Sequence, residues 1–435
     1  MAVECVCLLA QEHVKFRIPE LHSIASIHGI NLSHDGSSEK ISPFLKLKMP
    51  NLSCCQQILE RSMTVRYILE LWGSGSSVDE LVRSLNQYPP DKMELYGNTT
   101  FRINIETYNK KISQGQKQEY IKVLSFLPLD GKVNLNNPEH EFSLLLDFGD
   151  DNNAATDKPC QLFFGRLIGQ GQRHLLKKFS LKTRHFIGNT SMDPLLSFLM
   201  ANQGKARPGT LIFDPFVGTG NILLACAHFG GHVIGSDIDK NLVQGRGCKS
   251  SRANCKWKAR DEVMRTNFRQ AGLEQLFVDA IIADASRSVL RATPIFDAII
   301  TDPPYGVREG VRKLKADNNS VDTPYPAIKL GRLSDVIISL LHFASCYLTL
   351  HGRLVFWLPV HRQSYDDGLL PLHPCLALVA NSEQTLFRHI SRRLITMEKI
   401  RPHQTDVTLE TLTGQNIGFQ SMCDRFRDNY FSSPS

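Results

Sequence analysis

The chain has 435 residues, of which 42% are hydrophobic, and a formal net charge of +7. This length allows two or three domains with real cores, and the mild basicity is compatible with a polyanionic partner without requiring one. No apolar run is long enough to cross a bilayer, and no basic segment precedes Val6–Ala10, which argues against a membrane-spanning or exported protein. The eleven cysteines include no C-x-x-C pair, which predicts buried thiols in a reducing, cytoplasmic environment and no metal site.

Short strands and helices alternate through residues 1–180, which is the pattern of an α+β fold. We divide this region into one domain at 1–88 and a second at 89–180. The expected strands are Cys5–Leu9, Phe44–Leu47, Val65–Leu71 and Phe101–Tyr108, and the expected helices are Arg17–Ala25, Cys54–Ser62, Val78–Asn86 and Lys117–Leu127.

Basic residues crowd the segment between Phe163 and His185. Such a run is typical either of a solvated basic face or of a stripe that binds phosphates, and the residues alone leave both alternatives open. As an RNA-binding surface, the segment would use Arg166, Arg173, Lys177, Lys178, Lys182 and Arg184.

Residues 181–400 alternate strands with helices, which predicts a Rossmann-like, doubly wound and mostly parallel α/β sheet. We expect Thr190 to cap a helix that begins at Ser191, with Asp193 completing a capping box. Residues 401–435 lack periodicity and are rich in polar residues, so we expect a loosely held or disordered tail. The expected strands are Leu211–Phe213, His232–Ser236, Ile281–Ala283, Phe296–Thr301 and Gly352–Leu358, with Leu376–Val379 and Arg392–Lys399 as an antiparallel edge pair, and the expected helices include Asn221–Phe229 and Leu333–Leu348.

The first strand of this sheet runs into Asp214 and then a glycine-rich turn. Gly218 and Gly220 allow a ligand to approach the backbone, and the helix that follows presents free N–H groups. Asp237, after the second strand, stands where a carboxylate accepts hydrogen bonds from ribose hydroxyls. Leu223 replaces the third glycine of G-x-G-x-x-G, so a nucleoside with an amino-acid tail, such as S-adenosylmethionine, fits better than a dinucleotide.

The fourth strand ends in Asp302-Pro303-Pro304-Tyr305. The two prolines fix φ and lack backbone donors, so they form a rigid wall of acceptors beside the aromatic ring of Tyr305. Acceptors placed on the hydrogens of an exocyclic amine localise the nitrogen lone pair, which can then attack an electrophilic methyl group. Guanine offers N1–H and N2–H₂ side by side, which a carboxylate accepts together, although carboxylates also serve adenine enzymes.

Each of these residues also has an ordinary structural alternative. Asp302 can cap a turn, and Asp237 and Asp284 can simply solvate strand ends. Thr190 is at least a helix-capping residue. As a cofactor site, the candidate residues are Thr190, Asp214, Phe216, Gly218, Thr219, Gly220, Asp237, Asp284 and Asp302.

The sequence resembles the THUMP-containing tRNA guanine-N2 methyltransferases of the Trm-eleven type, which methylate guanosine 10 of tRNA. The resemblance covers nearly all of residues 1–400. It is carried by the motifs at Gly131–Leu135, Phe163–Arg166, Gly171–Arg173, Arg184–Asp193, Asp214–Gly220, Thr301–Gly306 and Ser391–Glu398.

The resemblance implies an S-adenosylmethionine-dependent enzyme with a ferredoxin-like unit at 1–88 and a THUMP domain at 89–180 that docks on tRNA. It also implies a small zinc-binding activator protein as partner, with the zinc belonging to that protein. Asp302, Pro303 and Tyr305 would grip the flipped guanine. Asn221 departs from the usual small residue after the glycine turn and could crowd the cofactor.

The cofactor roles of the family carry over to matching positions of this chain. Asp214, Gly218 and Gly220 would hold the methionine end of S-adenosylmethionine. Asp237 would bind the ribose and Asp284 the adenine.

Two other classes of function stay open at this point. One is another RNA guanine-N2 or DNA or RNA adenine-N6 amino-methyltransferase with the same core, although the long N-terminal region argues against a DNA enzyme. The other is a non-catalytic RNA-binding protein, against which the presence of Asp302 and the turn glycines argues.

Overall fold

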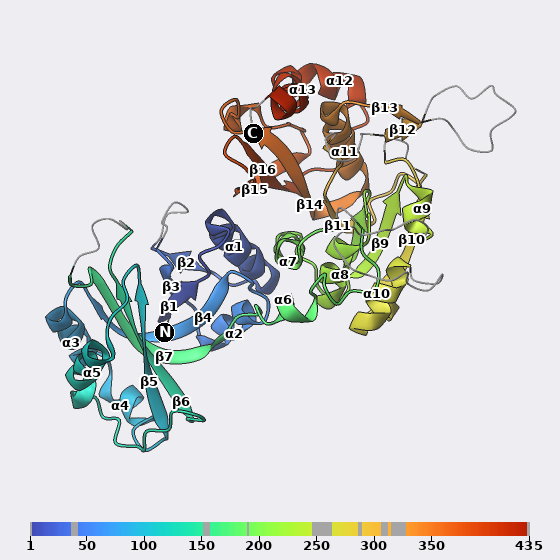
Figure 1. The fold of residues 1–435 in the computed structure, drawn as a ribbon. Helices are drawn as coiled ribbons and strands as arrows, with labels where there is room; N and C mark the ends of the chain where they lie inside the picture. Colours follow the sequence, from blue (N-terminus) through green and yellow to red (C-terminus); the bar gives the residue numbers. More distant parts are fainter. Residues whose placement is uncertain are drawn as a thin grey trace, which may run out of the picture. The chain divides into compact units, whose positions relative to one another are not determined.

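The structure is a computed structural model that describes residues 2–35, 42–150, 157–188, 191–245, 263–285, 289–305, 312–314 and 328–432. The chain forms two compact units, Met1–Arg173 and His174–Ser435 (Figure 1). Among the described helices, none combines the length and the apolar character that a membrane span requires.

In the first unit, seven described strands form one sheet in the order β2-β3-β1-β4-β7-β6-β5. Strand β4 pairs antiparallel with both β1 and β7, so the sheet continues across residue 88. The two domains predicted at 1–88 and 89–180 therefore share a single sheet, and the compact unit ends at Arg173. The strands are β1 (Val3–Leu9), β2 (Ser33–His34), β3 (Phe44–Met49), β4 (Val65–Gly75), β5 (Phe101–Tyr108), β6 (His140–Asp147) and β7 (Gln161–Gln170).

Apolar clusters and one buried acid hold the helices of this unit on its sheet. The carboxylate of Glu20 accepts hydrogen bonds from the hydroxyls of Ser62 (2.8 Å) and Thr64 (2.6 Å) and from the backbone N–H of Met63 (2.8 Å). A carboxylate removed from water is stable only with such partners, so Glu20 fixes α1 to the start of β4. The helices are α1 (Arg17–His28), α2 (Leu52–Leu59), α3 (Val78–Asn86), α4 (Pro90–Glu94) and α5 (Gln114–Val123).

The second unit contains the predicted doubly wound α/β sheet, in the order β10-β9-β8-β11-β14-β16-β15. The pairs from β10 to β14 are parallel, and β16 is antiparallel to both of its neighbours. The fold class and the antiparallel edge pair are thus confirmed. The strands are β8 (Leu211–Asp214), β9 (His232–Asp237), β10 (Phe277–Ile282), β11 (Phe296–Thr301), β14 (Leu348–His361), β15 (Leu376–Thr385) and β16 (Ile390–Lys399).

The winding of the sheet reverses at β8. From this strand the chain continues to β9 and β10 on one side, and then crosses to β11 and β14 on the other. Between β8 and β11 the flanking connections run in opposite directions, and at such a point open α/β sheets bind ligands in a crevice at the carboxyl ends of the strands. The helices of this unit are α6 (Leu175–Lys178), α7 (Pro194–Gln203), α8 (Asn221–His228), α9 (Lys240–Val243), α10 (Met264–Ala271), α11 (Leu333–Tyr347), α12 (Leu409–Gln415) and α13 (Ile417–Ser432).

Helix α7 begins later than predicted. Its first residue is Pro194, and the Asp193 carboxylate caps it by accepting hydrogen bonds from the backbone N–H groups of Leu195 (2.8 Å) and Leu196 (3.4 Å). Proline is favoured at this first helical position because no donor is needed there. The predicted cap at Thr190 is therefore wrong as a helix start, and Thr190 itself lies outside the described residues.

The prediction of a disordered tail from residue 401 is wrong for residues 409–432. Leu412 and Phe419 are 1% and 2% exposed and belong to the same core cluster as Leu341 of α11. The Ser334 hydroxyl of α11 also donates a hydrogen bond to Asp424 of α13 at 2.6 Å. The apolar residues of this segment are sparse among polar ones, so composition hid the helical spacing that buries them.

The packing of α13 gives the first testable prediction. Phe419→Ala should lower the free energy of unfolding of the second unit by about 3–5 kcal/mol, because it leaves a cavity in the core. Ile417→Ala is the matched control on the same helix, since Ile417 is 67% exposed. Urea unfolding of the full chain would measure both, and equal effects of the two variants would mean that α13 does not pack as described.

Candidate active site

Four carboxylates lie at the ends of four adjacent parallel strands. Asp237 and Asp214 are the last residues of β9 and β8. Asp302 directly follows β11, and Asp284 follows β10 by two residues. Because the strands are parallel and neighbouring, all four carboxylates lie along one edge of the sheet, which we call the carboxylate edge. The structure thus brings together the acidic residues that the sequence singled out.

Asp214 is the most buried member of this edge, with 1% of its surface exposed. One carboxylate oxygen accepts hydrogen bonds from the Thr301 hydroxyl at 2.6 Å and from the backbone N–H of Phe216 at 3.0 Å. Burial, together with the nearby carboxylates of Asp237 and Asp302, raises the pKa of Asp214 to about 7, and the two hydrogen bonds oppose this rise. An unliganded Asp214 is therefore poised between its neutral and charged forms near neutral pH.

The glycine turn after β8 is held by the next strand. The Asp237 carboxylate accepts a hydrogen bond from the backbone N–H of Gly218 at 3.0 Å. Gly218 and Gly220 have φ values of +52° and +79°, a region that favours glycine. A Cβ added at Gly218 would meet no atom within 4 Å, whereas one at Gly220 would collide with Met264 of α10. The turn thus combines a packed glycine with one that borders open space, as close ligand approach requires.

The segment before α7 packs against the same turn. Thr219 is buried, and its hydroxyl is 2.9 Å from the Ser191 hydroxyl and accepts a hydrogen bond from the Asn221 side chain at 3.1 Å. The side-chain oxygen of Asn221 accepts a hydrogen bond from the Arg184 guanidinium. Asn221 therefore serves as an anchor of the turn, a role that the sequence did not suggest. Phe216, the remaining predicted cofactor residue, is half-buried in the turn.

Arg184 does not form part of an RNA-binding stripe. Its side chain is buried, with 7% exposure, and it also donates a hydrogen bond to the backbone carbonyl of Phe179 at 2.7 Å. Burial lowers the pKa of Arg184 to about 10, which still leaves it charged at neutral pH. A guanidinium committed to internal acceptors is not available to phosphates, so the prediction for Arg184 is wrong.

The other predicted basic residues divide into two groups. Arg166 donates two hydrogen bonds to the Glu70 carboxylate, at 3.0 and 2.9 Å, and lies 4.6 Å from the centre of the Tyr96 ring. Arg173 pairs with Glu12 and donates to a backbone carbonyl. Both arginines therefore support the first unit. The exposed residues of the predicted set are Lys177, Lys178 and Lys182.

Asp302 is held by two partners in the described residues. The Tyr305 hydroxyl donates a hydrogen bond to one of its carboxylate oxygens, and the guanidinium of Arg392 lies 3.5 Å from the other. Arg392 also donates to the Tyr305 hydroxyl at 3.3 Å. Pro303 is buried, and its ring fixes the backbone of the loop.

Arg392 is the site residue that the sequence analysis missed. It comes from β16, its guanidinium stacks 4.0 Å from the centre of the Trp357 ring, and its Nε donates to Gln384 at 2.7 Å. Burial lowers the pKa of Arg392, but the neighbouring Tyr305 hydroxyl and Asp302 carboxylate raise it by more, so the pKa lies above its ordinary value. Only its place in the motif Ser391–Glu398 marked it in the sequence, and that motif gave it no role.

The sheet is doubly wound, a glycine turn follows its first strand, and carboxylates stand at the ends of the neighbouring strands. This is the architecture of the S-adenosylmethionine-dependent methyltransferases. In agreement, residues 182–317 match the family model described as RMKL-like, methyltransferase domain. Residues 3–173 match the model described as Tmrp11 THUMP N-terminal domain.

Curated relatives extend this likeness over almost the whole chain. The chain is 46% identical to tRNA (guanine(10)-N(2))-methyltransferase TRMT11 of Gallus gallus, with 98% of this chain and 94% of the relative covered. The human TRMT11 is 44% identical, with 99% and 97% covered. The Schizosaccharomyces pombe tRNA (guanine(10)-N(2))-methyltransferase is 30% identical, with 98% and 95% covered. The chain therefore belongs to the tRNA (guanine(10)-N(2))-methyltransferase family.

The titration of Asp214 gives the second prediction. Its native pKa of about 7 lies above the ordinary value of 3.8, so between these pH values the native state keeps a proton that the unfolded chain has lost. The contribution of Asp214 to stability therefore falls as the pH rises from about 4 to about 7. Asp214→Asn removes this titration, and its stability relative to the parent chain should increase over that range and then level off.

Urea unfolding at pH 5 and pH 8 in the absence of cofactor would measure the difference. Asp366→Asn, which changes an exposed carboxylate of the same unit, is the control. A stability difference between Asp214→Asn and the parent chain that stays constant with pH would contradict the assignment.

Proposed function

We propose that this protein transfers the methyl group of S-adenosylmethionine to the exocyclic N2 of guanosine 10 in tRNA. The observation that carries the proposal is the 2.6 Å hydrogen bond from Thr301 to Asp214. It joins the strand that leads into Asp302 to the strand that leads into the glycine turn. The bond supports the proposal because Asp302 and the glycine turn, which would serve the amine and the methyl donor, follow directly after the two strands that it links.

The carboxylate edge suits S-adenosylmethionine, which supplies an electrophilic methyl group on a sulfonium. Asp214 would accept the ammonium of the methionine end, and a cation at this place favours its ionised form. Asp237 would bind the ribose hydroxyls, and the buried Asp284 the adenine amine. Gly218, with open space beside it, would allow close approach of the backbone to the ligand. The turn residues Phe216, Thr219 and Gly220 complete the proposed pocket.

The Asp302 loop would hold the base. Asp302 and the carbonyl of Pro303 accept hydrogen bonds from the N2 amine, which turns the nitrogen lone pair towards the methyl group. The Tyr305 ring stacks on the flipped guanine, and Asp302 takes the proton that N2 releases. Arg392 acts as a positioning residue, because it holds Asp302 and Tyr305 in place without reaching the base.

Two partners belong to this proposal. The substrate is tRNA, which the THUMP-containing first unit would bind together with the exposed lysines at 177, 178 and 182. The second partner is a small zinc-binding activator protein, with which the chain would form a heterodimer. We place the reaction in the cytoplasm.

The third prediction tests the reaction itself. The full chain, purified with its activator, should transfer labelled methyl from S-adenosylmethionine to unmodified tRNA and yield N2-methylguanosine at position 10 only. Asp302→Ala should lower turnover by roughly two to four orders of magnitude, because it removes the acceptor for the amine. Binding of tRNA should barely change, since Asp302 lies at the reacting group. Nucleoside mapping by mass spectrometry identifies the product, and methyl on adenosine or at another position would refute the proposal.

Variants of two arginines on β16 distinguish a positioning role from a purely structural role in this assay. Arg392→Gln should lower turnover by about tenfold or more with little change in the KM for tRNA, because it removes one of the partners that hold Asp302 among the described residues. Arg393→Gln is the matched control, because Arg393 stacks on Tyr365 and not on the Asp302 group. Equal losses in the two variants would assign Arg392 to the fold alone.

The fourth prediction concerns the basic segment. Replacing Lys177, Lys178 and Lys182 by alanine should weaken tRNA binding and flatten its dependence on salt, by about 0.7–0.9 in log–log slope for each phosphate that a lysine no longer neutralises. Arg184→Gln should instead destabilise the second unit and leave the slope unchanged, because Arg184 is buried. Binding titrations at several salt concentrations would measure both, and an unchanged slope in the triple variant would return these lysines to an ordinary solvated face.

A further inference from the structure

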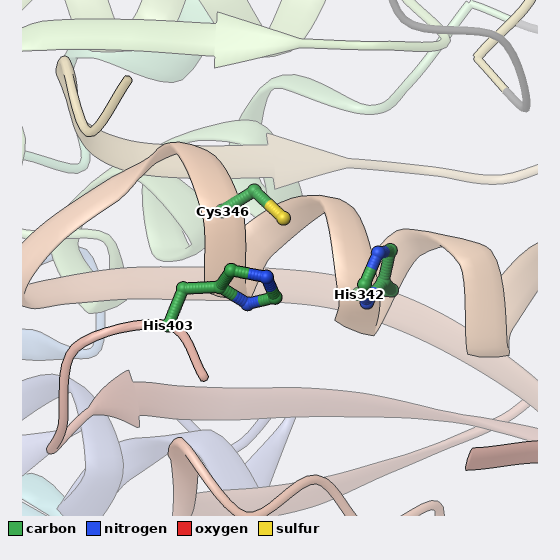
Figure 2. A group of neighbouring side chains, drawn as sticks. All are labelled: His342, Cys346 and His403. Carbon is green, nitrogen blue, oxygen red and sulfur yellow. The ribbon is translucent and has the colours of Figure 1, made fainter. Parts of the chain in front are cut away.

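Two histidines and a cysteine meet on the second unit, in a place that the methyl transfer does not use. His342 and Cys346 lie four residues apart on α11, so they project from the same face of the helix. His403 comes from the segment after β16 and lies opposite them (Figure 2). One potential ligand atom from each side chain lies within 4.8 Å of the other two, and all three residues are half-buried. We call these three residues the HCH cluster.

We propose that the HCH cluster binds a zinc ion that ties the segment after β16 to helix α11. Thiolate and imidazole are the ligands that zinc prefers, at about 2.3 Å for sulfur and about 2.0–2.1 Å for nitrogen. The three ligand atoms lie within 4.8 Å of one another, so zinc binding would require side-chain rotations that bring them to these distances.

Hydrogen bonding leaves Nε2 of His403 available as a metal ligand. The Ser345 hydroxyl donates its single proton to the backbone carbonyl of His342 at 2.8 Å. The approach of 2.9 Å between this hydroxyl and Nδ1 of His403 therefore requires that Nδ1 be the donor. Nε2 of His403 then carries the lone pair, and the Nδ1–H bond orients the ring, as second-sphere partners do at metal sites.

His342 provides an independent observation. Its Nδ1 is buried and has no hydrogen-bond partner among the described residues. A buried polar atom without a partner is costly, and coordination to a metal ion would satisfy it. The rings of His342 and His403 lie 5.4 Å apart at 75°, so they approach each other edge to face rather than in a stack.

The neighbouring His373 is not the fourth ligand. Its Nδ1 accepts a hydrogen bond from the backbone N–H of Cys375 at 3.0 Å, so the neutral ring carries its proton on Nε2. Zinc at the HCH cluster would accordingly have three protein ligands from the described residues, with its fourth position open to solvent.

The loop that carries His403 is fixed before any ion binds. The backbone N–H of Ile400 donates to the carbonyl of Cys375 at 2.9 Å, and the Cys375 thiol donates to the carbonyl of Pro402 at 3.3 Å. His403 is thus presented to α11 by a pinned segment, which reduces the entropy lost on binding a metal. Because α12 and α13 follow directly, zinc here would strengthen the attachment of the C-terminal helices to the core.

Cobalt substitution tests the proposal. Titrated with Co²⁺, the full chain should take up about one ion with the intense visible bands of four-coordinate cobalt and a near-ultraviolet thiolate-to-cobalt band, all displaced by Zn²⁺. Cys346→Ser should abolish the thiolate band, and His403→Gln should weaken cobalt binding by about tenfold or more. Cys160→Ser, which changes an exposed cysteine of the first unit, should behave like the parent chain.

Thermal unfolding provides the second readout. Zn²⁺ should raise the melting temperature of the parent chain and of Cys160→Ser, but not that of Cys346→Ser or His403→Gln. Metal-free melting curves of the variants report whether they fold. If Cys346→Ser does not fold, His403→Gln still tests the proposal. Absence of the thiolate band in the parent chain, or a band that persists without Cys346, would overturn the proposal. Neither readout involves methyl transfer, so its outcome is independent of the proposed function.

In the complex with a zinc-binding activator, comparison of Cys346→Ser with the parent chain shows which protein holds each zinc ion. Zinc content per complex should fall by about one equivalent in Cys346→Ser relative to the parent complex, because the remaining zinc belongs to the partner. An unchanged zinc content would mean that this chain holds none.

Discussion

The carboxylate edge depends on the hydrogen bond between Thr301 and Asp214. A carboxylate that is almost fully buried requires partners, and the Thr301 hydroxyl at 2.6 Å is the closest of those described. The bond also fixes how far β11 extends relative to β8, because Thr301 is the last residue of its strand. The rigid proline loop begins at the next residue. The position of Asp302 relative to the glycine turn is therefore set by the sheet and not by the loop.

Electrostatics explains why so many carboxylates share one edge. Their mutual repulsion raises the cost of ionising Asp214 and makes the unliganded site unfavourable for negative charge. S-adenosylmethionine carries a sulfonium and an ammonium, both positive, and its binding at this edge, as proposed, would relieve the repulsion among these carboxylates. The same negative edge would repel the phosphates of tRNA. Attraction of the RNA must then come from other surfaces, such as the exposed lysines at 177, 178 and 182.

Local sequence patterns predicted the features that adjacent residues determine. The run Phe296–Thr301 matches β11 residue for residue, and the carboxylates after the parallel strands fell on one edge because chain direction alone requires it. Strands β6 and β7 were not predicted, because each contains a run of consecutive buried residues, Phe142–Asp147 and Leu162–Gly165, which shows no alternation. The C-terminal helices escaped because a few apolar residues, spaced for burial, stand in a polar segment.

Long-range partners could not be predicted, because nothing in one segment indicates its distant neighbour. Arg392 reaches Asp302 across the sheet from β16. Arg166 reaches Glu70 from β7 in the same manner. The basic segment is an example. Its arginines bond to internal oxygen acceptors, for which a planar guanidinium is well shaped, whereas its lysines are exposed. A count of basic residues therefore overestimates how many of them are available to bind RNA, because arginines with internal partners are counted as well.

The partners of Asp302 suggest how its carboxylate is kept hydrogen-bonded before a substrate binds. One oxygen accepts from Tyr305 and the other faces Arg392, so neither points unoccupied into the crevice. Burial and the Asp302 charge raise the pKa of Tyr305 well above its ordinary value, so its hydroxyl keeps the proton that it donates. A guanine amine offers the same kind of donor, and can replace the Tyr305 hydroxyl without leaving Asp302 unpaired. This exchange would free the tyrosine ring to stack on the base, while Arg392, which stacks on Trp357, would keep the carboxylate in place. In the proposed reaction, entry of the base would therefore replace one hydrogen bond by another, and the geometry for methyl transfer would form only with a donor that can take the place of the Tyr305 hydroxyl.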